Sequence, residues 1–406
     1  MRLKLLVIPA LALAAALGVG SIASAAPSAA VQTINVTVGG GSGGVATNGF
    51  YPGTLTIHLG DTVHFANSYE EPHTATFLPT GTAMPALLVP DPHGSPAIGF
   101  NPAIAFASPA SPAAFDQSKM INSGLLLKGS SYDVKFTGSG TFKFLCALHP
   151  NMLLTINAVT NASSADTQAT ADARAATEAK ATLDAGNAVV TTLNAKAVSS
   201  AKMADGSTNF TITPGSDADV TGSPDVADIL HFFPGNVSIK QGDTVTWVNA
   251  DLTPHTVSFM SGAASPPLVT PIVAPGGPPF LAITAQIALP AGGKTYDGTG
   301  FANSGIFDKT GVPNPSTYSL KFTAAGTFKY VCLLHENQGM TGTVTVAASG
   351  TGGAGGTPSV PVTAPSTGTG PAPAGNGGWL PALLALGVVG ALCVLAGTRP
   401  IWRQEA

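Results

Sequence analysis

Hydrophobic and polar residues alternate in short runs at two separate places in the chain. Residues 54–60 and 236–242, "TLTIHLG" and "NVSIKQG", alternate, and after a Gly-Asp turn the alternation resumes at 61–67 and 243–249. A period of two residues is typical of strands with one buried face. Many short strands at regular spacing predict an all-β chain built from Greek-key β-sandwiches.

These strand patterns belong to an internal repeat. Residues 50–77 align without gaps to residues 232–259 and are identical at 13 of the 28 positions. A second pair of matching blocks covers 132–149 and 318–335, and each block looks like a hairpin followed by a cysteine. Between the blocks only "NSG", at 122–124 and 303–305, is shared. The sequence therefore predicts two tandem sandwich domains, at 32–158 and 208–347.

The segment between the two repeats differs in kind. Residues 163–197 are rich in strong helix formers, and a serine at 163 or 164 is a possible N-cap. We therefore predict a helical linker within 159–207 that acts as a spacer and is interrupted at Gly186. Residues 348–378 are rich in Gly, Pro, Ser and Thr, without a hydrophobic period, which indicates a stalk.

Both ends of the chain carry apolar segments. Residues 1–25 have a basic start, an apolar run and a small-residue "ASA" end, which is the layout of a secretory signal peptide. Residues 379–397 are uncharged and mostly apolar, and a stretch of this length just reaches across a bilayer. Arginines follow within 398–406 and favour a cytoplasmic tail. We expect a single-pass transmembrane helix that holds an exported body on the extracytoplasmic side of the cell membrane.

Composition narrows the possible functions. Charged residues make up only 9% of the 406 residues, and the formal net charge is −4. An electrostatic nucleic-acid binder would need a basic face, so that class is excluded. Of the three cysteines, Cys393 lies in the apolar segment, and Cys146 and Cys332 could form one disulfide. Both, however, have a histidine and a methionine nearby, which a disulfide does not explain and a thiolate bound to a soft metal does.

Each repeat supplies four candidate metal ligands. The histidine of a "PHT" motif ends one strand, and a cysteine, a histidine and a methionine follow on the loop between the last two strands. Two strand ends at one pole of a sandwich would bring all four together. Two imidazoles, a thiolate and a weak axial thioether make a type 1 copper site. The candidates are His73, Cys146, His149 and Met152 in the first repeat, and His255, Cys332, His335 and Met340 in the second.

With these motifs both repeats resemble cupredoxins, the plastocyanin, amicyanin and pseudoazurin family of blue copper proteins. "CALHPNM" has the spacing of amicyanins, and "CLLHENQGM" has that of plastocyanins and pseudoazurins. The resemblance covers 32–158 and 208–347. It implies one type 1 copper in each domain and one-electron transfer with redox protein partners, whose identities it does not give. It also implies that His149 and His335 are the ligand edges nearest solvent, where electrons would enter or leave.

This chain departs from a compact plastocyanin in length. The first histidine precedes the cysteine by 73 positions in one repeat and by 77 in the other, so each repeat carries an insertion. The insertions, 79–118 and 261–300, are expected to extend the docking faces. Because the two ligand loops differ in length by two residues, we also expect two distinguishable reduction potentials.

Other functional classes fit less well. Multicopper oxidases and copper nitrite reductases place a histidine beside the cysteine, whereas Leu145, Ala147, Val331 and Leu333 are the neighbours in this chain. We therefore predict that the chain is not an enzyme. Copper storage or delivery usually shows Met-rich or His-rich tracts, and none is present. A copper-free structural surface protein would fit the stalk and anchor equally well, and only metal content separates it from an electron carrier.

Overall fold

The computed structural model describes residues 30–95, 97–273, 279–311 and 313–348. From Val31 onward the described residues belong to one compact unit, and β-strands are their most common regular structure, as predicted. Among these residues no helix is long and apolar enough to cross a membrane. The predicted signal peptide, nearly all of the stalk, the predicted transmembrane helix and the tail lie outside the described residues.

The first repeat has two layers of strands. In one layer the first strand, β1, lies between β2 and β4. It pairs antiparallel with β2 and parallel with β4. This layer contains β1 (Thr33–Ser42), β2 (Val45–Tyr51), β4 (Thr62–Ala66), β9 (Ala113–Ala114) and β11 (Ser131–Lys135). The other layer contains β3 (Thr54–His58), β5 (Thr76–Phe77), β8 (Ala107–Ser108), β10 (Ile121–Ser123), β12 (Gly140–Leu145) and β13 (Leu153–Val159).

Apart from the additional strand β14, which pairs with β15, the second repeat has the same strand order in each layer, so the duplication of the sequence is also a duplication of topology. One layer contains β14 (Ser199–Lys202), β15 (Thr208–Asp219), β16 (Val226–Phe233), β18 (Thr244–Val248), β23 (Thr295–Tyr296) and β25 (Thr317–Phe322). The other contains β17 (Asn236–Lys240), β19 (Ser258–Phe259), β22 (Pro290–Ala291), β24 (Ala302–Ser304), β26 (Gly326–Val331) and β27 (Thr341–Ala347).

Aromatic side chains fill the space between the two layers of each repeat. In the first, the Phe65 and Phe144 rings, one from each layer, lie with centroids 5.3 Å apart and are fully buried. In the second, Trp247 and Phe259 lie 5.9 Å apart in an edge-to-face arrangement. These residues sit at the inward positions of the alternating pattern, so the period-two pattern of the sequence correctly predicts the face that each strand buries.

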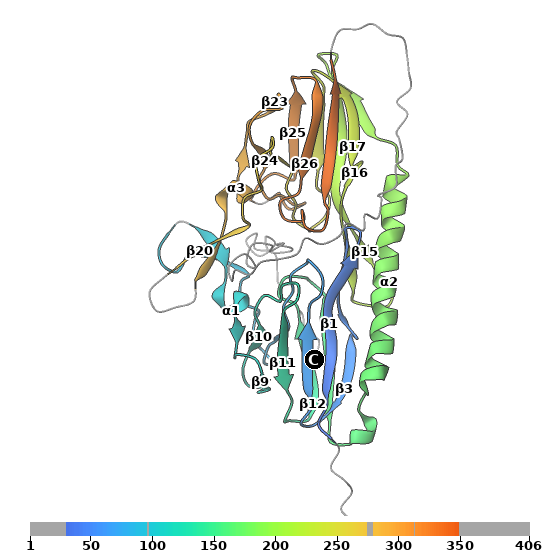
Figure 1. Cartoon of the computed structure of the whole chain (residues 1–406), viewed down its shortest axis with the longest axis vertical. Coiled ribbons are helices and arrows are strands. Elements are labelled where there is room, and N and C mark those ends of the chain that lie inside the picture. Colours follow the sequence, from blue (N-terminus) through green and yellow to red (C-terminus); the bar gives the residue numbers. More distant parts are fainter. Residues whose placement is uncertain (1–29, 96, 274–278, 312, 349–406) are drawn as a thin grey trace, which may run out of the picture. The chain divides into compact units, whose positions relative to one another are not determined.

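The two repeats are joined by strand pairing as well as by the linker. Strand β2 pairs antiparallel with β16, from Val45 opposite Ile229 to Asn48 opposite Val226, and this makes one continuous sheet through both repeats. Figure 1 shows these strands beside the long helix α2 (Gln168–Asn194), which follows a short 3₁₀ turn at Ala162–Ser164. The repeats are therefore one connected body within the described residues.

Helix α2 confirms the predicted helix but corrects its expected interruption. It runs without a break through Gly186, which is buried. A Cβ at this position would lie 2.4 Å from Val45 Cγ1 and 3.0 Å from Ala227 Cβ. Glycine is therefore present because the helix approaches closely the strands that join the repeats, and the surrounding helical residues offset its low propensity.

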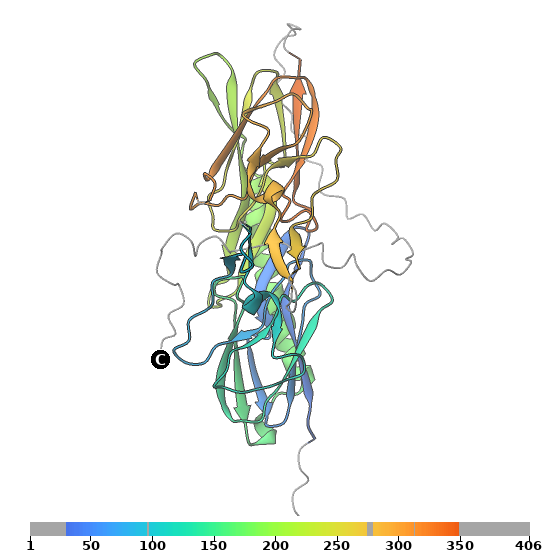
Figure 2. The ribbon, with the colours of Figure 1, turned by 90° about the vertical axis from the view of Figure 1, so that its left-hand side faces the viewer.

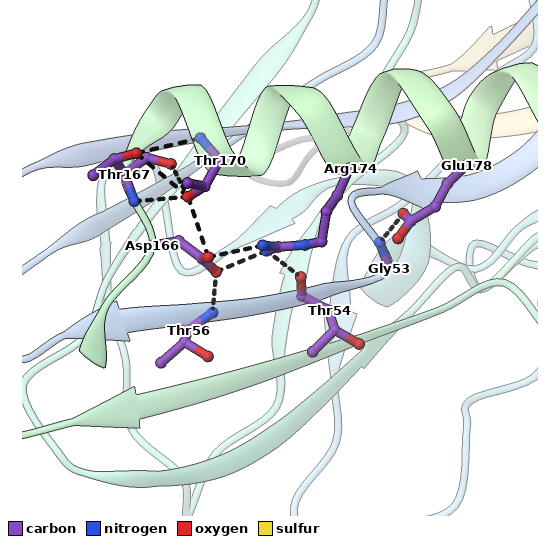
Figure 3. Close-up of polar contacts among 8 residues, drawn as sticks. All are labelled: Gly53, Thr54, Thr56, Asp166, Thr167, Thr170, Arg174 and Glu178. Atoms are coloured by element: carbon purple, nitrogen blue, oxygen red, sulfur yellow. Dashed lines mark hydrogen bonds and ion pairs between the residues drawn. The ribbon is translucent and has the colours of Figure 1, made fainter. Parts of the chain in front are cut away.

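The N-terminal part of α2 is fixed to the first repeat by a polar cluster (Figure 3). Arg174 donates to an oxygen of Asp166 at 2.7 Å and to the backbone oxygen of Thr54 at 3.0 Å. The Asp166 carboxylate also accepts the backbone N–H of Thr56, and Glu178 accepts that of Gly53, both at 2.8 Å. The helix thus packs on the sheet as a brace, a contact that the prediction of a spacer helix did not include.

The two insertions pair with each other. Strands β6 (Leu88–Pro90) and β7 (Ile98–Phe100) from the first repeat and β20 (Val269–Ile272) and β21 (Phe280–Ile283) from the second form a four-stranded sheet. Gly99 pairs with Ala282 at its centre, and a short helix follows in each repeat, α1 (Pro102–Ala105) and α3 (Ala285–Ala288) (Figure 1 and Figure 2). The insertions therefore connect the repeats, whereas the sequence-based expectation was that they extend two docking faces.

Candidate metal centres

The predicted ligands of the first repeat converge. His73 lies between β4 and β5, and Cys146 and His149 lie in the loop between β12 and β13. Their ligand atoms all lie within 4.8 Å of one another. Cys146 Sγ is 3.9 Å from His73 Nδ1 and 3.4 Å from His149 Nδ1. The first centre therefore offers one sulfur and two ring nitrogens that face a common point.

The second repeat builds the same arrangement. Cys332 Sγ lies 3.9 Å from His255 Nδ1 and 3.5 Å from His335 Nδ1, and the two Nδ1 atoms lie 3.2 Å apart. Cys332 and Cys146 are both free and buried. The disulfide that the cysteine count left open is therefore not formed.

Both methionines close the ligand loops. Met152 and Met340 are fully buried. The backbone oxygen of Met152 accepts the N–H of Cys146 at 3.1 Å, and that of Met340 accepts the N–H of Cys332 at 3.0 Å. This pairing extends the β12–β13 and β26–β27 hairpins by one residue on each strand, to the cysteine. The fourth predicted ligand of each set is therefore adjacent to the cysteine across its hairpin.

The threonine of each "PHT" motif supports the cysteine, a role that the sequence reasoning missed. The backbone N–H of Thr74 donates to Cys146 Sγ at 3.3 Å, and the N–H of Thr256 donates to Cys332 Sγ at 3.3 Å. The Thr74 hydroxyl accepts the N–H of Ala147 at 2.7 Å. Hydrogen bonds of this kind favour the thiolate form of a cysteine. The recurrence of "PHT" in both repeats was the available signal.

The shared "NSG" motif links each centre to its insertion. Asn122 accepts the hydroxyl of Thr76 at 2.8 Å, and its amide nitrogen donates to the backbone oxygens of Ala103, Ile104 and Phe106 around α1. In the second repeat Asn303 accepts the hydroxyl of Ser258 at 2.8 Å and donates to Gln286, Ile287 and Leu289 around α3. One asparagine per repeat thus ties the strand that follows the first histidine to the insertion.

A glycine makes room for the first histidine of each centre. Gly39, at a bulge in β1, has φ +69°, and a Cβ there would lie 1.9 Å from His73 Nε2. Gly215, at a bulge in β15, has φ +71°, and its Cβ would lie 2.1 Å from His255 Nε2. Both glycines serve the bulge conformation and the ring beside it. They stand outside the aligned blocks, so sequence comparison of the repeats did not reveal them.

The loop histidines are buried, which corrects an expectation from the family resemblance. His149 is 1% exposed and His335 is 0% exposed. His149 Nε2 lies 3.7 Å from Glu71 Oε1, and the Glu71 side chain is itself 1% exposed. These rings were expected to be the edges nearest solvent. The chain covers them because the loops that carry them lie where the two repeats meet.

The carboxylate of Glu71 makes the first centre electrostatically different from the second. Burial opposes protonation of His149, but the Cys146 sulfur and the Glu71 carboxylate raise the pKa of that histidine to about 10. For Cys146, burial favours the thiol, yet the neighbouring His149 and backbone N–H groups lower its pKa overall. Burial and His149 hold the pKa of His73 well below its usual range.

In the second centre burial dominates. It raises the pKa of the Cys332 thiol to about 11 and lowers the pKa of His255 to about 3. Burial, then His255, then His149 of the first centre lower the pKa of His335 well below its ordinary value. Thr253 stands at the position that Glu71 occupies in the first repeat, so no carboxylate offsets the burial of His335. Before it holds a metal, the second centre favours a neutral thiol and neutral imidazoles.

The donor chemistry fits copper. Thiolate sulfur is a ligand of soft metals, imidazole binds both oxidation states of copper, and this set with an axial thioether is typical of type 1 sites. In both centres the Nδ1 atoms face the sulfur while the Nε2 atoms point away and lack a hydrogen-bond partner. The two Nδ1 atoms and the sulfur of each centre are therefore placed to bind one metal ion together.

Comparison with known proteins agrees with this chemistry. The profile of "Copper binding proteins, plastocyanin/azurin family" matches residues 218–347. Plastocyanin of Scenedesmus fuscus is 32% identical over 117 residues, which are 29% of this chain and 87% of that protein. Chloroplastic plastocyanin of Physcomitrium patens is 30% identical over 118 residues, 29% of this chain and 51% of that protein. An oxidised amicyanin variant of known structure covers 31% of this chain and 82% of its own, at 16% identity and a TM-score of 0.20.

The chain belongs to the plastocyanin/azurin family of copper-binding proteins. It is a blue copper protein, and its cofactor is type 1 copper at two sites. Cupredoxin electron carriers interact with redox protein partners.

Proposed function

We propose that this protein is a one-electron carrier, exported and anchored in the cell membrane, with one type 1 copper bound by each repeat. In the first repeat the ligands are His73, Cys146, His149 and Met152. In the second they are His255, Cys332, His335 and Met340. The bound copper supplies a centre that gains or loses one electron. The hydrogen bonds around each ligand loop hold the ligating side chains in place before and after the electron is exchanged.

The observation that carries this proposal is the duplicated convergence of one sulfur and two ring nitrogens in a buried site. Each sulfur accepts a backbone N–H, and each ligand loop is closed by a hairpin hydrogen bond. Such supports restrict the movement of the ligands, which suits a centre that changes oxidation state without rearrangement.

An electron carrier rather than an enzyme is favoured by the burial of the ligands. An oxidase or reductase needs an open metal position at which a substrate binds. All six of the described nitrogen and sulfur donors belong to residues that are 1% exposed or less. We therefore propose that electrons, and no substrate, reach the two centres.

Export and anchoring rest on the sequence. Residues 1–25 have the layout of a signal peptide, and 379–397 form an apolar stretch followed by arginines. We propose that residues 32–347 lie on the extracytoplasmic side. Membrane fractionation with protease protection tests this part. In cells whose outer layers have been removed but whose cytoplasmic membrane is intact, added protease should digest residues 32–347. Recovery of the full chain in the cytosolic fraction would refute it.

Absorption spectroscopy of the full chain tests the metal centres. Copper-loaded, oxidised protein should show an intense thiolate-to-copper band in the visible range, bind two coppers per chain and lose the band on reduction. The Cys146→Ser and Cys332→Ser variants should each lose one copper and part of the band. Material that is colourless and binds no copper would instead support the structural-protein alternative.

A further inference from the structure

One buried hydrogen bond joins the neighbourhoods of the two metal centres. Gln338 Nε2 of the second repeat donates to Glu71 Oε2 of the first at 2.7 Å. The other carboxylate oxygen of Glu71 lies 3.7 Å from His149 Nε2. On the far side, the backbone N–H of Gln338 donates to the backbone oxygen of His335 at 3.2 Å. Glu71 and Gln338 therefore lie in sequence between the ring of His149 and the backbone of His335. The steps from Glu71 to Gln338 and from Gln338 to His335 are hydrogen bonds, and the step from His149 to Glu71 is an approach of 3.7 Å.

Both members of this bridge are specific to one repeat. Thr253 occupies the place of Glu71 in the second repeat. Gln338 lies in the ligand loop that is two residues longer, "CLLHENQGM" against "CALHPNM". The same loop in the first repeat has no glutamine. The duplicated halves thus diverge at both residues of this contact.

The bridge lies inside the molecule. Glu71 is 1% exposed and Gln338 is 8% exposed. Burying a carboxylate costs several kcal/mol unless hydrogen bonds and charges offset it. The carboxylate is next to His149 and receives an amide donor, and the backbone oxygen of Glu71 is fixed by Asn67 at 2.6 Å. Glu71 Oε1 itself has no hydrogen-bond partner, so the cost of burying this carboxylate is only partly offset, and such a cost indicates that the position of the side chain has a use.

The same burial closes the usual approach to the centres. Neither the His149 ring nor the His335 ring can be touched by an outside protein, since both are covered. The ligand loop that carries His335 instead meets the first repeat, through the hydrogen bond from Gln338 to Glu71. Two strand pairings between the repeats, β2 with β16 and β7 with β21, hold the two repeats together on either side of this contact.

We propose that the two metal centres work as one coupled pair, with Glu71 and Gln338 as the connection through which an electron passes from one centre to the other. This inference rests on the proposed function, since it assumes a one-electron centre in each repeat. The exchange is balanced: one centre is oxidised by one electron, and the other is reduced by one electron. No bond is made or broken in the step. A one-electron redox protein reduces the pair, and a second one oxidises it.

The bridge has two physical effects. It places polar atoms between the two histidines, and hydrogen bonds join these atoms from Glu71 to the backbone of His335. It also couples the two centres electrostatically. Because a buried carboxylate interacts strongly with nearby charges, the oxidation state of one centre should change the reduction potential of the other. The two reduction steps should therefore depend on each other, and neither should behave like the step of an isolated domain.

The test uses the copper-loaded full chain in detergent. A short light pulse with a photoreductant delivers less than one electron per chain, and the visible spectrum then reports how reduction redistributes between the two centres. We expect a second phase whose rate does not change when the protein is diluted. Gln338→Leu should slow that phase several-fold and leave both absorption bands in place. Glu336→Gln is the matched control, because it removes an exposed carboxylate from the same loop and should leave the phase unchanged.

A second variant covers the possibility that Gln338→Leu, which leaves Glu71 buried without its amide donor, fails to fold. The double variant Glu71→Met/Gln338→Leu removes both polar groups together, which is usually tolerated better than removing one.

A second readout does not depend on the kinetics. In redox titrations the potential of the second centre should shift between the wild-type chain and Cys146→Ser, and the shift should shrink in the double variant.

The outcomes separate the two proposals. If both centres bind copper and titrate but redistribution is absent or needs collisions between molecules, the coupling is refuted and the carrier function stands. Redistribution that is equally fast in the wild type and in both bridge variants would refute the role of Glu71 and Gln338. Failure of both centres to bind copper would refute the proposed function itself.

Discussion

The space beside His73 Nε2 exists because residue 39 has no side chain: a Cβ on Gly39 would stand 1.9 Å from that nitrogen. The second repeat has the same relationship between Gly215 and His255, at 2.1 Å. In both cases the glycine occupies a strand bulge with positive φ. The metal centres thus depend on the strand on which the histidine ring packs as well as on the ligand loop.

We expect Gly39→Ala to impair the first centre selectively. The substitution brings strain from positive φ and a clash with the ring, and together these should destabilise the chain by about 2 to 4 kcal/mol. Copper content and the visible band should fall to those of a chain with one working centre. Gly43→Ala is the control: this glycine of the β1–β2 turn has φ +58°, and a Cβ on it would meet no atom within 4 Å, so it brings the strain without the clash. Equal effects of both substitutions on copper content would contradict the role of Gly39 in making room for the His73 ring.

The two centres should have different reduction potentials, and the first should have the lower one. The Glu71 carboxylate beside His149 favours the more positive, oxidised state, and the second centre has Thr253 at that position. A redox titration followed in the visible band should show two waves. Glu71→Gln should raise the potential of the first centre and bring the waves closer together. A single unsplit wave in the wild type, or no movement in the variant, would contradict this explanation.

Gly186→Ala should destabilise the protein, although this substitution within a helix ordinarily stabilises by about 0.5 to 1 kcal/mol. The new methyl group would lie 2.4 Å from Val45 Cγ1 and must displace the strands that join the repeats. We expect a loss of about 1 to 3 kcal/mol in the free energy of unfolding, measured by urea denaturation. Asn187→Ala, one position further along and exposed, should be neutral or slightly stabilising. A gain in stability from Gly186→Ala would show that α2 is not packed as described.

The stability of the body should fall as the pH rises from about 4 to 6, in part because of Asp225. Burial raises the pKa of this carboxyl from 3.8 to about 6, and Glu178 on α2 adds to the rise while Ser223 opposes it. A carboxyl whose pKa is higher in the folded state contributes stability below its unfolded pKa, and this is lost as the pH passes the folded value.

The Asp225→Asn variant should flatten this dependence and raise the stability at pH 7 by about 1 kcal/mol. Unfolding by urea at several pH values between 3.5 and 7.5 measures both effects. The control is Asp219→Asn, an exposed carboxylate on the neighbouring strand β15. Parallel pH profiles of the wild type and the Asp225 variant would contradict the assignment.

Much of the site was readable from the sequence because the motifs recur. The "PHT" and Cys-x-x-His blocks identified His73, Cys146, His255 and Cys332 as neighbours, and the ligand atoms do converge. The roles of Thr74 and of the "NSG" asparagines were missed, although both motifs are shared by the repeats. A repeated polar residue signals a common function but does not say which backbone group it will bind.

The sequence by itself determined what is local and periodic: the strands, the duplication, the donor set and the metal that such donors prefer. Only the tertiary structure decided that the repeats share a sheet, that their insertions pair, and that Glu71 and Gln338 meet between the two centres. It also decided that His149 and His335 are covered. The physical reason is that alternation specifies which face of a strand is buried, whereas the partner of a strand edge or of a ligand loop depends on surfaces hundreds of residues apart in the chain.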